Sequence, residues 1–291
     1  MTLRLLAVHA HPDDESSKGA ATYAYYRDRG VEVTVVSCTG GERGDIQNPA
    51  LEQTAMADRD MAGLRRREMA RAQSLMGIDH RWLGYFDSGL PENGEALQPQ
   101  SFAMIPLEIS GVPLVKVIRE VRPHVVVTYD ENGGYPHPDH IRTNEVTMWA
   151  LAAAADADVL PEWGAAWTVD KLYYDRIMSP QRFRAVYDAM KSSLPNHPLL
   201  ASFDDMQDWM GERPDSTITT QVPVSDFFAV RDQALRSHAS QVAPDSPFFF
   251  WPNELQQTAW PWEDFELVRS LVDTTLPEGD LFAGITDKDN R

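Results

Sequence analysis

Short apolar runs alternate with helix-like segments over the first half of this chain, and that alternation restricts the fold more than any other feature. Runs suited to buried strands cover residues 3–8, 31–38, 82–85 and 124–129. Helical spacing of apolar residues covers residues 18–29, 62–76, 114–121 and 141–155. Strands and helices that alternate in this way form a parallel sheet through right-handed crossovers. The predicted fold class is therefore α/β, with a Rossmann-like, mostly parallel sheet flanked by helices.

The second half of the chain is predicted to extend this core. Strands are expected at 171–178 and 217–224, and helices at 181–194 and 226–241. The second of these strands alternates Thr with apolar residues, which is typical of a sheet edge. The remaining stretch to residue 285 is rich in Phe, Trp and Pro, which indicates ordered loops that cap the core or line a pocket.

A chain of 291 residues is long enough for one large α/β domain. We expect a single domain over 1–291, in which 1–156 form the core with the functional site and 157–291 complete the sheet and the pocket. Residues 91–112 lack periodicity, and such a stretch in a compact domain is typical of a lid or an insertion. Residues 286–291 are expected to fray.

Imidazole and acidic side chains gather in two turns that follow predicted strands. Residues 9–15 have the sequence HAHPDDE, and residues 133–140 have the sequence GGYPHPDH, so the triplet His-Pro-Asp occurs twice. Parallel strands end at the same edge of a sheet, where the loops after them build the ligand site. His11, Asp14, His137 and His140 are therefore predicted to meet in a metal site.

The chemistry of such a site follows from its ligands. If His11, Asp14 and His140 hold zinc, a fourth position stays open for water, as in catalytic rather than structural sites. Zinc lowers the pKa of water toward about 7, and Asp13 is placed to take the proton. His137 and Tyr135 are candidates to donate hydrogen bonds to an oxyanion. These parts suit amide or ester hydrolysis, and the ligand types allow zinc or iron(II).

Simpler interpretations exist for several of these residues. Asp13 or Asp14 can act as the N-cap of the following helix. His9 is expected to be a buried side chain that supports the turn. The glycine-rich turn with Glu42 suits either substrate contacts or a solvated ion pair. Asp87 lies on the same edge only if the strand before it is parallel, and the arginine run 65–67 is typical of solvated charge.

Composition excludes several classes of partner. The chain has 44 acidic against 26 basic residues and a formal net charge of −18, which repels phosphate backbones and anionic membranes. We therefore expect a small-molecule substrate, with no nucleic-acid or membrane partner. The single cysteine, Cys38, allows no intrachain disulfide and fits a cytoplasmic location. No segment approaches the roughly 20 apolar residues of a membrane span, and the first apolar run is too short for a signal peptide.

Beyond these inferences, the two turns resemble those of the LmbE-like zinc deacetylases, also called the PIG-L family. The resemblance runs over nearly the whole chain. It is carried by the two turns and by the stretches ESSKG at 15–19, TGGERG at 39–44, DSGL at 87–90, TYDENGGY at 128–135 and RDQALRSH at 231–238. Within the family, the chain is similar to the amidase branch that acts on mycothiol S-conjugates.

The resemblance implies roles for individual residues. It implies zinc on His11, Asp14 and His140, Asp13 as general base, and His137 as the group that stabilises the oxyanion with help from Tyr135.

It also implies substrate contacts. Glu42, Arg65 and Asp87 are expected to contact the glucosaminyl-inositol part of a substrate, and Lys18 is expected to belong to recognition of the cysteinyl part.

The implied reaction is hydrolysis of the amide bond of a mycothiol S-conjugate, which releases an N-acetylcysteine S-conjugate and glucosaminyl-inositol. Removal of the acetyl group from N-acetylglucosaminyl-inositol or another N-acyl sugar uses the same chemistry and is the alternative. A third interpretation, from another class, is a non-catalytic α/β protein that binds a small ligand and uses the aspartates as caps.

Overall fold

The computed structural model describes residues 2–91, 95–203 and 213–286. Within these ranges seven strands form one sheet in the order β3-β2-β1-β4-β5-β7-β6. The strands are β1 Arg4–His9, β2 Glu32–Thr39, β3 Asp79–Tyr85, β4 Val125–Thr128, β5 Lys171–Asp175, β6 Thr220–Pro223 and β7 Trp262–Ser270. β1 to β5 pair in parallel, and β7 runs antiparallel to both β5 and β6. The predicted α/β fold class is confirmed.

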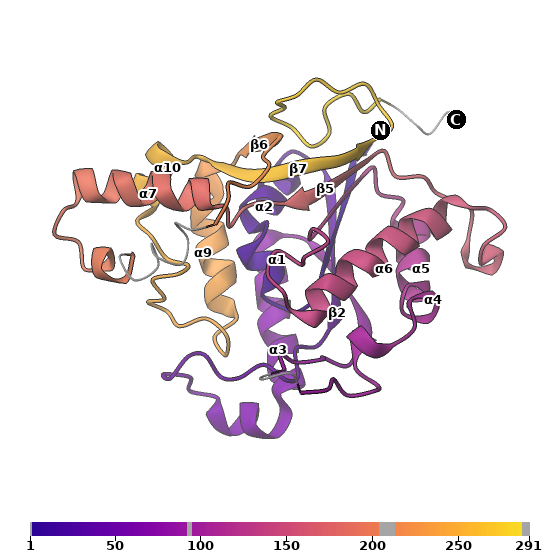
Figure 1. Cartoon of the computed structure of the whole chain (residues 1–291), viewed down its shortest axis with the longest axis horizontal. Coiled ribbons are helices and arrows are strands. Elements are labelled where there is room, and N and C mark those ends of the chain that lie inside the picture. Colours follow the sequence, from indigo (N-terminus) through magenta and orange to yellow (C-terminus); the bar gives the residue numbers. More distant parts are fainter. Residues whose placement is uncertain (1, 92–94, 204–212, 287–291) are drawn as a thin grey trace.

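Helices cover both faces of the sheet. The α-helices are α1 Asp14–Ser17, α2 Ala20–Asp28, α3 Thr54–Met76, α4 Leu107–Ser110, α5 Val112–Val121, α6 Pro138–Ala155, α7 Pro180–Ser193, α9 Phe228–Ser237 and α10 Asn253–Ala259. Short 3-10 helices occupy Phe102–Met104, Pro161–Trp163 and Ser225–Phe227. Figure 1 shows α5 and α6 on one side of the sheet and α2, α3 and α9 on the other.

The two faces bury separate hydrophobic cores because side chains alternate along a strand. Leu5 and Ala7 of β1 point into the core under α2, α3 and α9. Leu6 and Val8 point into the core under α5 and α6. All four side chains are fully buried, as expected for a central parallel strand.

Several predicted boundaries were wrong. The helix predicted at 62–76 begins at Thr54 and bends at Asp60, whose backbone is not helical. The strand predicted at 171–178 ends at Asp175, and the helix predicted at 226–241 ends at Ser237. The strand predicted at 217–224 is β6, and its position at the sheet edge is confirmed.

The prediction of loops for the aromatic-rich tail was wrong in part, because the tail contains α10 and β7. β7 carries two acidic residues that are nonetheless buried, Glu263 and Asp264. Glu263 accepts a hydrogen bond from the backbone N–H of Thr22, and Asp264 accepts one from the indole of Trp260. Those partners compensate the burial of carboxylates that otherwise indicate an exposed loop.

Two predicted irregular segments reach beyond the described residues. Of the predicted lid or insertion at 91–112, residues 92–94 lie outside them, and the rest contains a 3-10 turn and α4. Of the segment expected to fray, residues 287–291 lie outside them.

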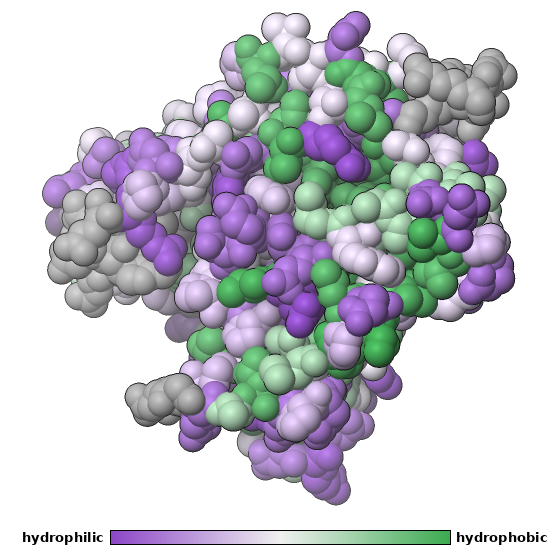
Figure 2. Space-filling view, turned by 45° about the vertical axis from the view of Figure 1, so that its right-hand side comes forward, coloured by the Kyte–Doolittle hydropathy of each residue, from purple (hydrophilic) through white to green (hydrophobic). Residues whose placement is uncertain are grey.

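The visible face in Figure 2 carries both hydrophilic and hydrophobic residues, and neither kind covers it alone. Across residues 2–91, 95–203 and 213–286, every helix is too short or too polar to span a bilayer.

Candidate metal and catalytic site

The two His-Pro-Asp turns lie side by side because β1 and β4 are neighbours. Leu5 pairs with Val125 and Ala7 with Val127, so both strands end at the same edge of the sheet. The imidazole rings of His11 and His140 are 5.3 Å apart between centroids. One ligand atom from each of His11, Asp14 and His140 lies within 4.8 Å of the other two. The structure thus brings together side chains that are well separated in the sequence.

The spacing of these three side chains suits a tetrahedral metal ion. Asp14 Oδ2 is 3.5 Å from His11 Nδ1 and 3.4 Å from His140 Nε2. Metal–ligand bonds of about 2.0–2.1 Å at the tetrahedral angle separate neighbouring ligand atoms by roughly 3.4 Å. His140 Nε2 is buried and has no hydrogen-bond partner among the described residues. A buried nitrogen without a partner is costly unless a ligand completes it.

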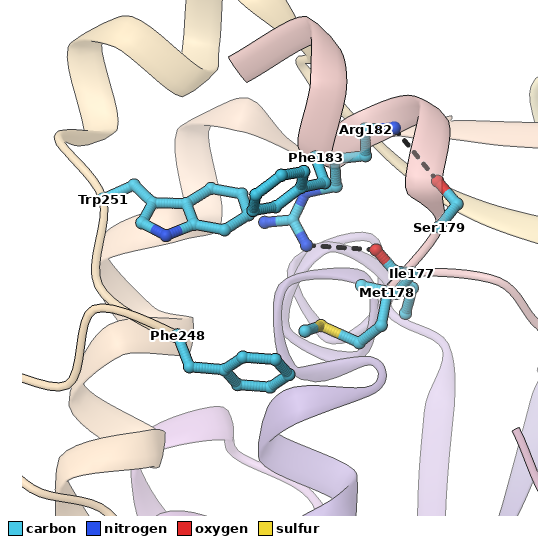
Figure 3. A pocket seen from close by; sticks show the side chains of 7 residues that line it. All are labelled: Ile177, Met178, Ser179, Arg182, Phe183, Phe248 and Trp251. Atoms are coloured by element: carbon cyan, nitrogen blue, oxygen red, sulfur yellow. Dashed lines mark hydrogen bonds between the residues drawn. The ribbon is translucent and has the colours of Figure 1, made fainter. Parts of the chain in front are cut away.

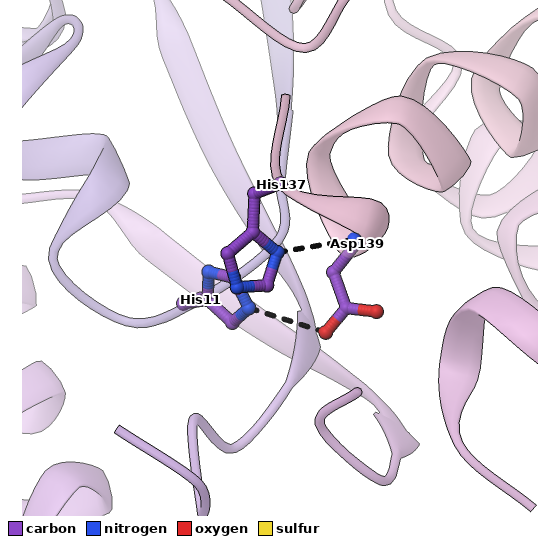
Figure 4. Close-up of side chains that lie close together, drawn as sticks. All are labelled: His11, His137 and Asp139. Atoms are coloured by element: carbon purple, nitrogen blue, oxygen red, sulfur yellow. Dashed lines mark hydrogen bonds and ion pairs between the residues drawn. The ribbon is translucent and has the colours of Figure 1, made fainter. Parts of the chain in front are cut away.

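Hydrogen bonds on the opposite ring nitrogens orient His11 and His140, and Figure 4 shows the bond of His11. His140 Nδ1 is 3.0 Å from the carbonyl oxygen of Gly133 and must donate to it, which leaves the lone pair of Nε2 for a metal. His11 Nε2 is 3.2 Å from a carboxylate oxygen of Asp139, which fixes Nδ1 as the free nitrogen in the same way. A carboxylate behind a ligating histidine is typical of zinc sites.

A second group of possible ligands shares His11 but adds His137 and Asp139. Both added residues already have partners, as Figure 4 shows for His137. His137 Nδ1 accepts the backbone N–H of Asp139 at 3.1 Å. Asp139 Oδ2 accepts the backbone N–H of Ser88 at 2.9 Å in addition to the bond with His11. The first group of three fits a metal better because it includes the buried His140 Nε2, which has no hydrogen-bond partner among the described residues.

His137 is arranged as a neutral hydrogen-bond donor. Because its Nδ1 accepts a hydrogen bond, the proton resides on Nε2. Burial, reinforced by the nearby His11 and His140, lowers the pKa of His137 to about 3, so the ring is neutral near pH 7. Its ring lies 4.7 Å from that of His11 between centroids. Tyr135 is 40% exposed and contacts the ring of His140, at the rim of the same site.

The ligand candidates have opposite electrostatic environments. Burial alone would lower the pKa of His11, but hydrogen bonds to Asp139, Asp14 and Asp87 raise it well above its ordinary value. Burial alone would raise the pKa of Asp14, but His140 and Lys18 hold it well below its ordinary value. The carboxylate of Asp14 is therefore ionised, as a metal ligand must be.

Asp13 sits in a constrained turn. Its φ angle of 121° is unusual for a residue other than glycine, and its backbone N–H donates to Glu15 at 2.8 Å. Arg65 donates to a side-chain oxygen of Asp13 at 3.2 Å and to the carbonyl of Pro12. Burial raises the pKa of Asp13 and Arg65 opposes that rise. A raised pKa moves a carboxylate toward the range of a general base.

The capping interpretation of the two aspartates finds no support in the geometry of α1. Asp13 occupies the N-cap position but makes no side-chain cap hydrogen bond. Asp14 Oδ2 instead accepts the backbone N–H of His11 at 3.0 Å, and Oδ1 accepts from Lys18 at 2.5 Å. His9 is fully buried, as expected, with Nε2 2.9 Å from the hydroxyl of Tyr23.

The four predicted substrate contacts surround the ligand candidates. Lys18 contacts Asp14, and the carboxylate of Asp87 lies 3.6 Å from His11 Nε2. Glu42 accepts the backbone N–H of Asp87 at 3.1 Å. Arg65 is only 3% exposed. The interpretation of the arginine run 65–67 as solvated charge was therefore wrong for this residue. β3 is parallel to β2, which places Asp87 at the predicted edge.

Sequence reasoning missed the supporting residues. Asp139 lies inside the second His-Pro-Asp turn, and its repetition of the first turn was an available signal. Glu15 pairs with His238 at 2.7 Å, and both side chains are fully buried. Because these two residues are 223 positions apart, no local pattern could have paired them. The pair supports Asp13, whose N–H Glu15 accepts.

A cavity of about 600 Å³ opens beside the ligand candidates. Its polar lining includes Asp13, Asp14, Lys18, Tyr135 and Asp175. Its volume lies within the range of sites for drug-sized ligands, roughly 300–1,000 Å³.

A doubly wound α/β sheet with a His/Asp cluster and a cavity at the carboxyl ends of its strands offers a candidate metal site of the kind that supports hydrolysis. The chain belongs to the PIG-L family, since the family model described as GlcNAc-PI de-N-acetylase matches residues 6–151.

Relatives with known names match over nearly the full length. The chain is 48% identical to a mycothiol S-conjugate amidase of Streptomyces coelicolor over 98% of both chains. It is 40% identical to a 1D-myo-inositol 2-acetamido-2-deoxy-alpha-D-glucopyranoside deacetylase of Streptomyces avermitilis over 97% of both chains. These relatives are hydrolytic enzymes that act on amide bonds, in agreement with the predicted enzyme class.

Solved structures with low sequence identity share the fold. The N,N'-diacetylchitobiose deacetylase of Pyrococcus horikoshii has a TM-score of 0.60 at 20% identity, covering 91% of this chain and 83% of that one. The 4-carboxy-2-hydroxymuconate hydratase GalB of Pseudomonas putida has a TM-score of 0.58 at 15% identity, and the match covers 94% of this chain and 100% of that one. The fold alone therefore hosts more than one chemistry.

Proposed function

We propose that the protein is a zinc-dependent amidase that hydrolyses mycothiol S-conjugates to N-acetylcysteine S-conjugates and glucosaminyl-inositol. The observation that carries this proposal is 48% identity to a mycothiol S-conjugate amidase over 98% of both chains. The cluster of His11, Asp14 and His140 supplies the matching donor set. We further propose a role in detoxification of electrophiles in the cytoplasm, a setting that suits the buried, unpaired Cys38.

In this proposal His11, Asp14 and His140 hold zinc, with iron(II) as the other candidate metal. Zinc in this position supplies Lewis-acid activation of water and of the scissile carbonyl. Asp13, with its raised pKa, takes the proton of the attacking water and returns it to the leaving amine. Arg65 holds the carboxylate of Asp13 in place for both transfers.

His137 and Tyr135 act on the developing oxyanion. The Nε2–H group of His137 donates a hydrogen bond to the developing oxyanion, and the ring needs no charge for this task. Tyr135 assists from the rim. The glucosaminyl-inositol part binds on the side of β2 and β3, to Glu42, Arg65 and Asp87. Lys18, which contacts Asp14, binds the cysteinyl part.

A deacetylase for N-acetylglucosaminyl-inositol or another N-acyl sugar is the second candidate. It is favoured by the 40% identity to the Streptomyces avermitilis deacetylase over 97% of both chains. The same residues serve either reaction, since both cleave an amide of a glucosamine nitrogen.

Turnover of two substrates separates these candidates. Zinc-loaded protein is incubated with bimane-labelled mycothiol and, separately, with N-acetylglucosaminyl-inositol, and kcat/KM is measured for each. The proposal expects a clear preference for the mycothiol conjugate. A preference for the acetyl sugar would replace the amidase with the deacetylase.

Metal content and two variants test the enzyme against a non-catalytic binding protein. We expect zinc in protein purified without chelator, and zinc binding weakened by Asp14→Ala. Asp13→Ala is expected to keep the metal and lose roughly 10²–10⁴-fold in kcat, as for loss of a general base. A binding protein without catalysis instead predicts no stoichiometric metal, no turnover by the parent protein, and for Asp14→Ala only a loss of stability on the order of 1 kcal/mol.

A further inference from the structure

The lining of the 600 Å³ cavity includes apolar as well as polar side chains. Apolar side chains come from three segments of the C-terminal half: Met178 after β5, Leu235 on α9, and Val242, Phe248 and Phe249 in the loop after α9. They form one connected surface. Phe249 packs against Leu235 and Val242, and the rings of Phe248 and Phe249 are 4.9 Å apart between centroids. We call this surface the apolar arm.

The apolar arm has a wall behind it. Met178 and Phe248 also line a second cavity of only about 10 Å³, next to Phe183 and Trp251 (Figure 3). Since these two side chains line both spaces, they separate the large cavity from the small one. The small space holds no more than one water molecule. A group in the apolar arm therefore meets the side chains of Met178 and Phe248 on this side.

The lining of the cavity decides which half of a substrate faces the apolar arm. Glu42 and Asp87, the proposed sugar contacts, follow β2 and β3. Neither of them lines the cavity, whereas Asp13 and Asp14 of the β1 turn line it together with the apolar arm. With the sugar on Glu42 and Asp87, the acyl half of a cleaved amide enters the cavity.

We infer that the apolar arm is a binding site for the sulfur substituent of the substrate, and that it selects apolar, ring-sized substituents. This inference rests on the proposed amidase function. The acyl half of a mycothiol conjugate carries its substituent on the cysteine sulfur, whereas an acetyl group is far too small to reach the arm. Two phenylalanines, a methionine and two aliphatic side chains match an aromatic ring.

The test compares two synthetic mycothiol conjugates that differ only in the sulfur substituent, S-methyl and S-benzyl. For the zinc-loaded parent protein, kcat/KM for the S-benzyl conjugate is expected to exceed that for S-methyl by about tenfold or more, the range for burying several carbon atoms in an apolar pocket. Phe249→Ala and Met178→Ala, which truncate the arm from two separate segments, are each expected to lower this ratio at least about threefold.

A matched control is Phe227→Ala. Phe227 is also a partly buried phenylalanine, but it packs against Tyr25 away from the cavity. This variant is expected to keep the parent ratio. A parent ratio near one, or equal ratios in parent and both arm variants, would overturn the inference while leaving the amidase in place. Turnover of the acetyl sugar with no turnover of either conjugate would overturn the proposed function itself, and the inference with it.

Discussion

Two adjacent glycines offer a sharp test of how the backbone before α6 shapes the metal site. Gly133 and Gly134 have nearly equal φ angles of 73° and 72°, both in the left-handed region. An alanine at either position is strained by roughly 1–2 kcal/mol for that reason. Their surroundings differ. A Cβ on Gly133 would lie 2.6 Å from the Cβ of His140 and 2.9 Å from the carbonyl oxygen of Tyr135, whereas one on Gly134 meets nothing within 4 Å.

Gly133→Ala should therefore do more than Gly134→Ala. The Cβ contact forces His140 to move, and with it the hydrogen bond from His140 Nδ1 to the Gly133 carbonyl. Disturbance of such an orienting bond typically lowers metal affinity by about 10–100-fold. We expect that loss for Gly133→Ala, and a free energy of unfolding at least about 1 kcal/mol lower than for Gly134→Ala, because overpacking adds to the shared backbone strain.

The assay has two readouts. Zinc affinity is measured by competition with a chromophoric chelator. The stability of the metal-free protein is measured by urea titration, with tryptophan fluorescence as the signal. Equal zinc affinities for the two alanine variants would show that the position of His140 does not depend on the space at Gly133. Equal stabilities of the metal-free variants would refute the steric argument independently of any metal.

Three other predictions concern stability. Arg119→Met should lower the free energy of unfolding, measured by urea titration, by about 3–5 kcal/mol. The reason is that the guanidinium donates to five backbone carbonyls at and after the end of α6, and two of these bonds are fully buried. A decrease of less than about 1 kcal/mol would contradict this. Lys171→Met should lower the free energy of unfolding by about 3–5 kcal/mol, because it leaves the buried Glu278 carboxylate without its cationic partner. Adding Glu278→Gln to this variant should restore most of the lost stability. Burial lowers the pKa of His80 to about 4, so the unfolded chain binds a proton below pH 6.5 that the folded chain refuses. Folding stability should therefore fall by up to about 3 kcal/mol between pH 6.5 and 4, and His80→Gln should flatten that fall in urea titrations at each pH.

The parallel half of the sheet and the convergence of the two turns could be predicted from the sequence for a physical reason. Strands buried on both faces leave continuous apolar runs, such as Val125 to Val127, and the loops after parallel strands share one edge. Residue types then limited the chemistry, because His11, Asp14 and His140 are donors that a divalent metal prefers.

Other features depend on long-range contacts that leave no local pattern. β7 was interpreted as loop because the tail is rich in aromatic residues and proline. The partners of its buried Glu263 and Asp264, Thr22 and Trp260, are known only from the fold. The same holds for the support of Asp13 by Glu15 and His238. Sequence reasoning treats a charged residue as exposed, and it fails where tertiary hydrogen bonds compensate burial.

The location of the site follows from which face of the sheet each helix covers. α2, which follows the β1 turn and α1, packs on the face of Leu5, whereas α6, which follows the β4 turn, packs on the opposite face with Leu6. Loops that leave two adjacent strands toward opposite faces open a crevice between them, and this happens between β1 and β4, where the strand order reverses. His11 and Asp14 therefore approach from one wall of the crevice and His140 from the other. The hydrophobic patterns of two helices, rather than any attraction between the polar side chains, thus decide that these three residues meet.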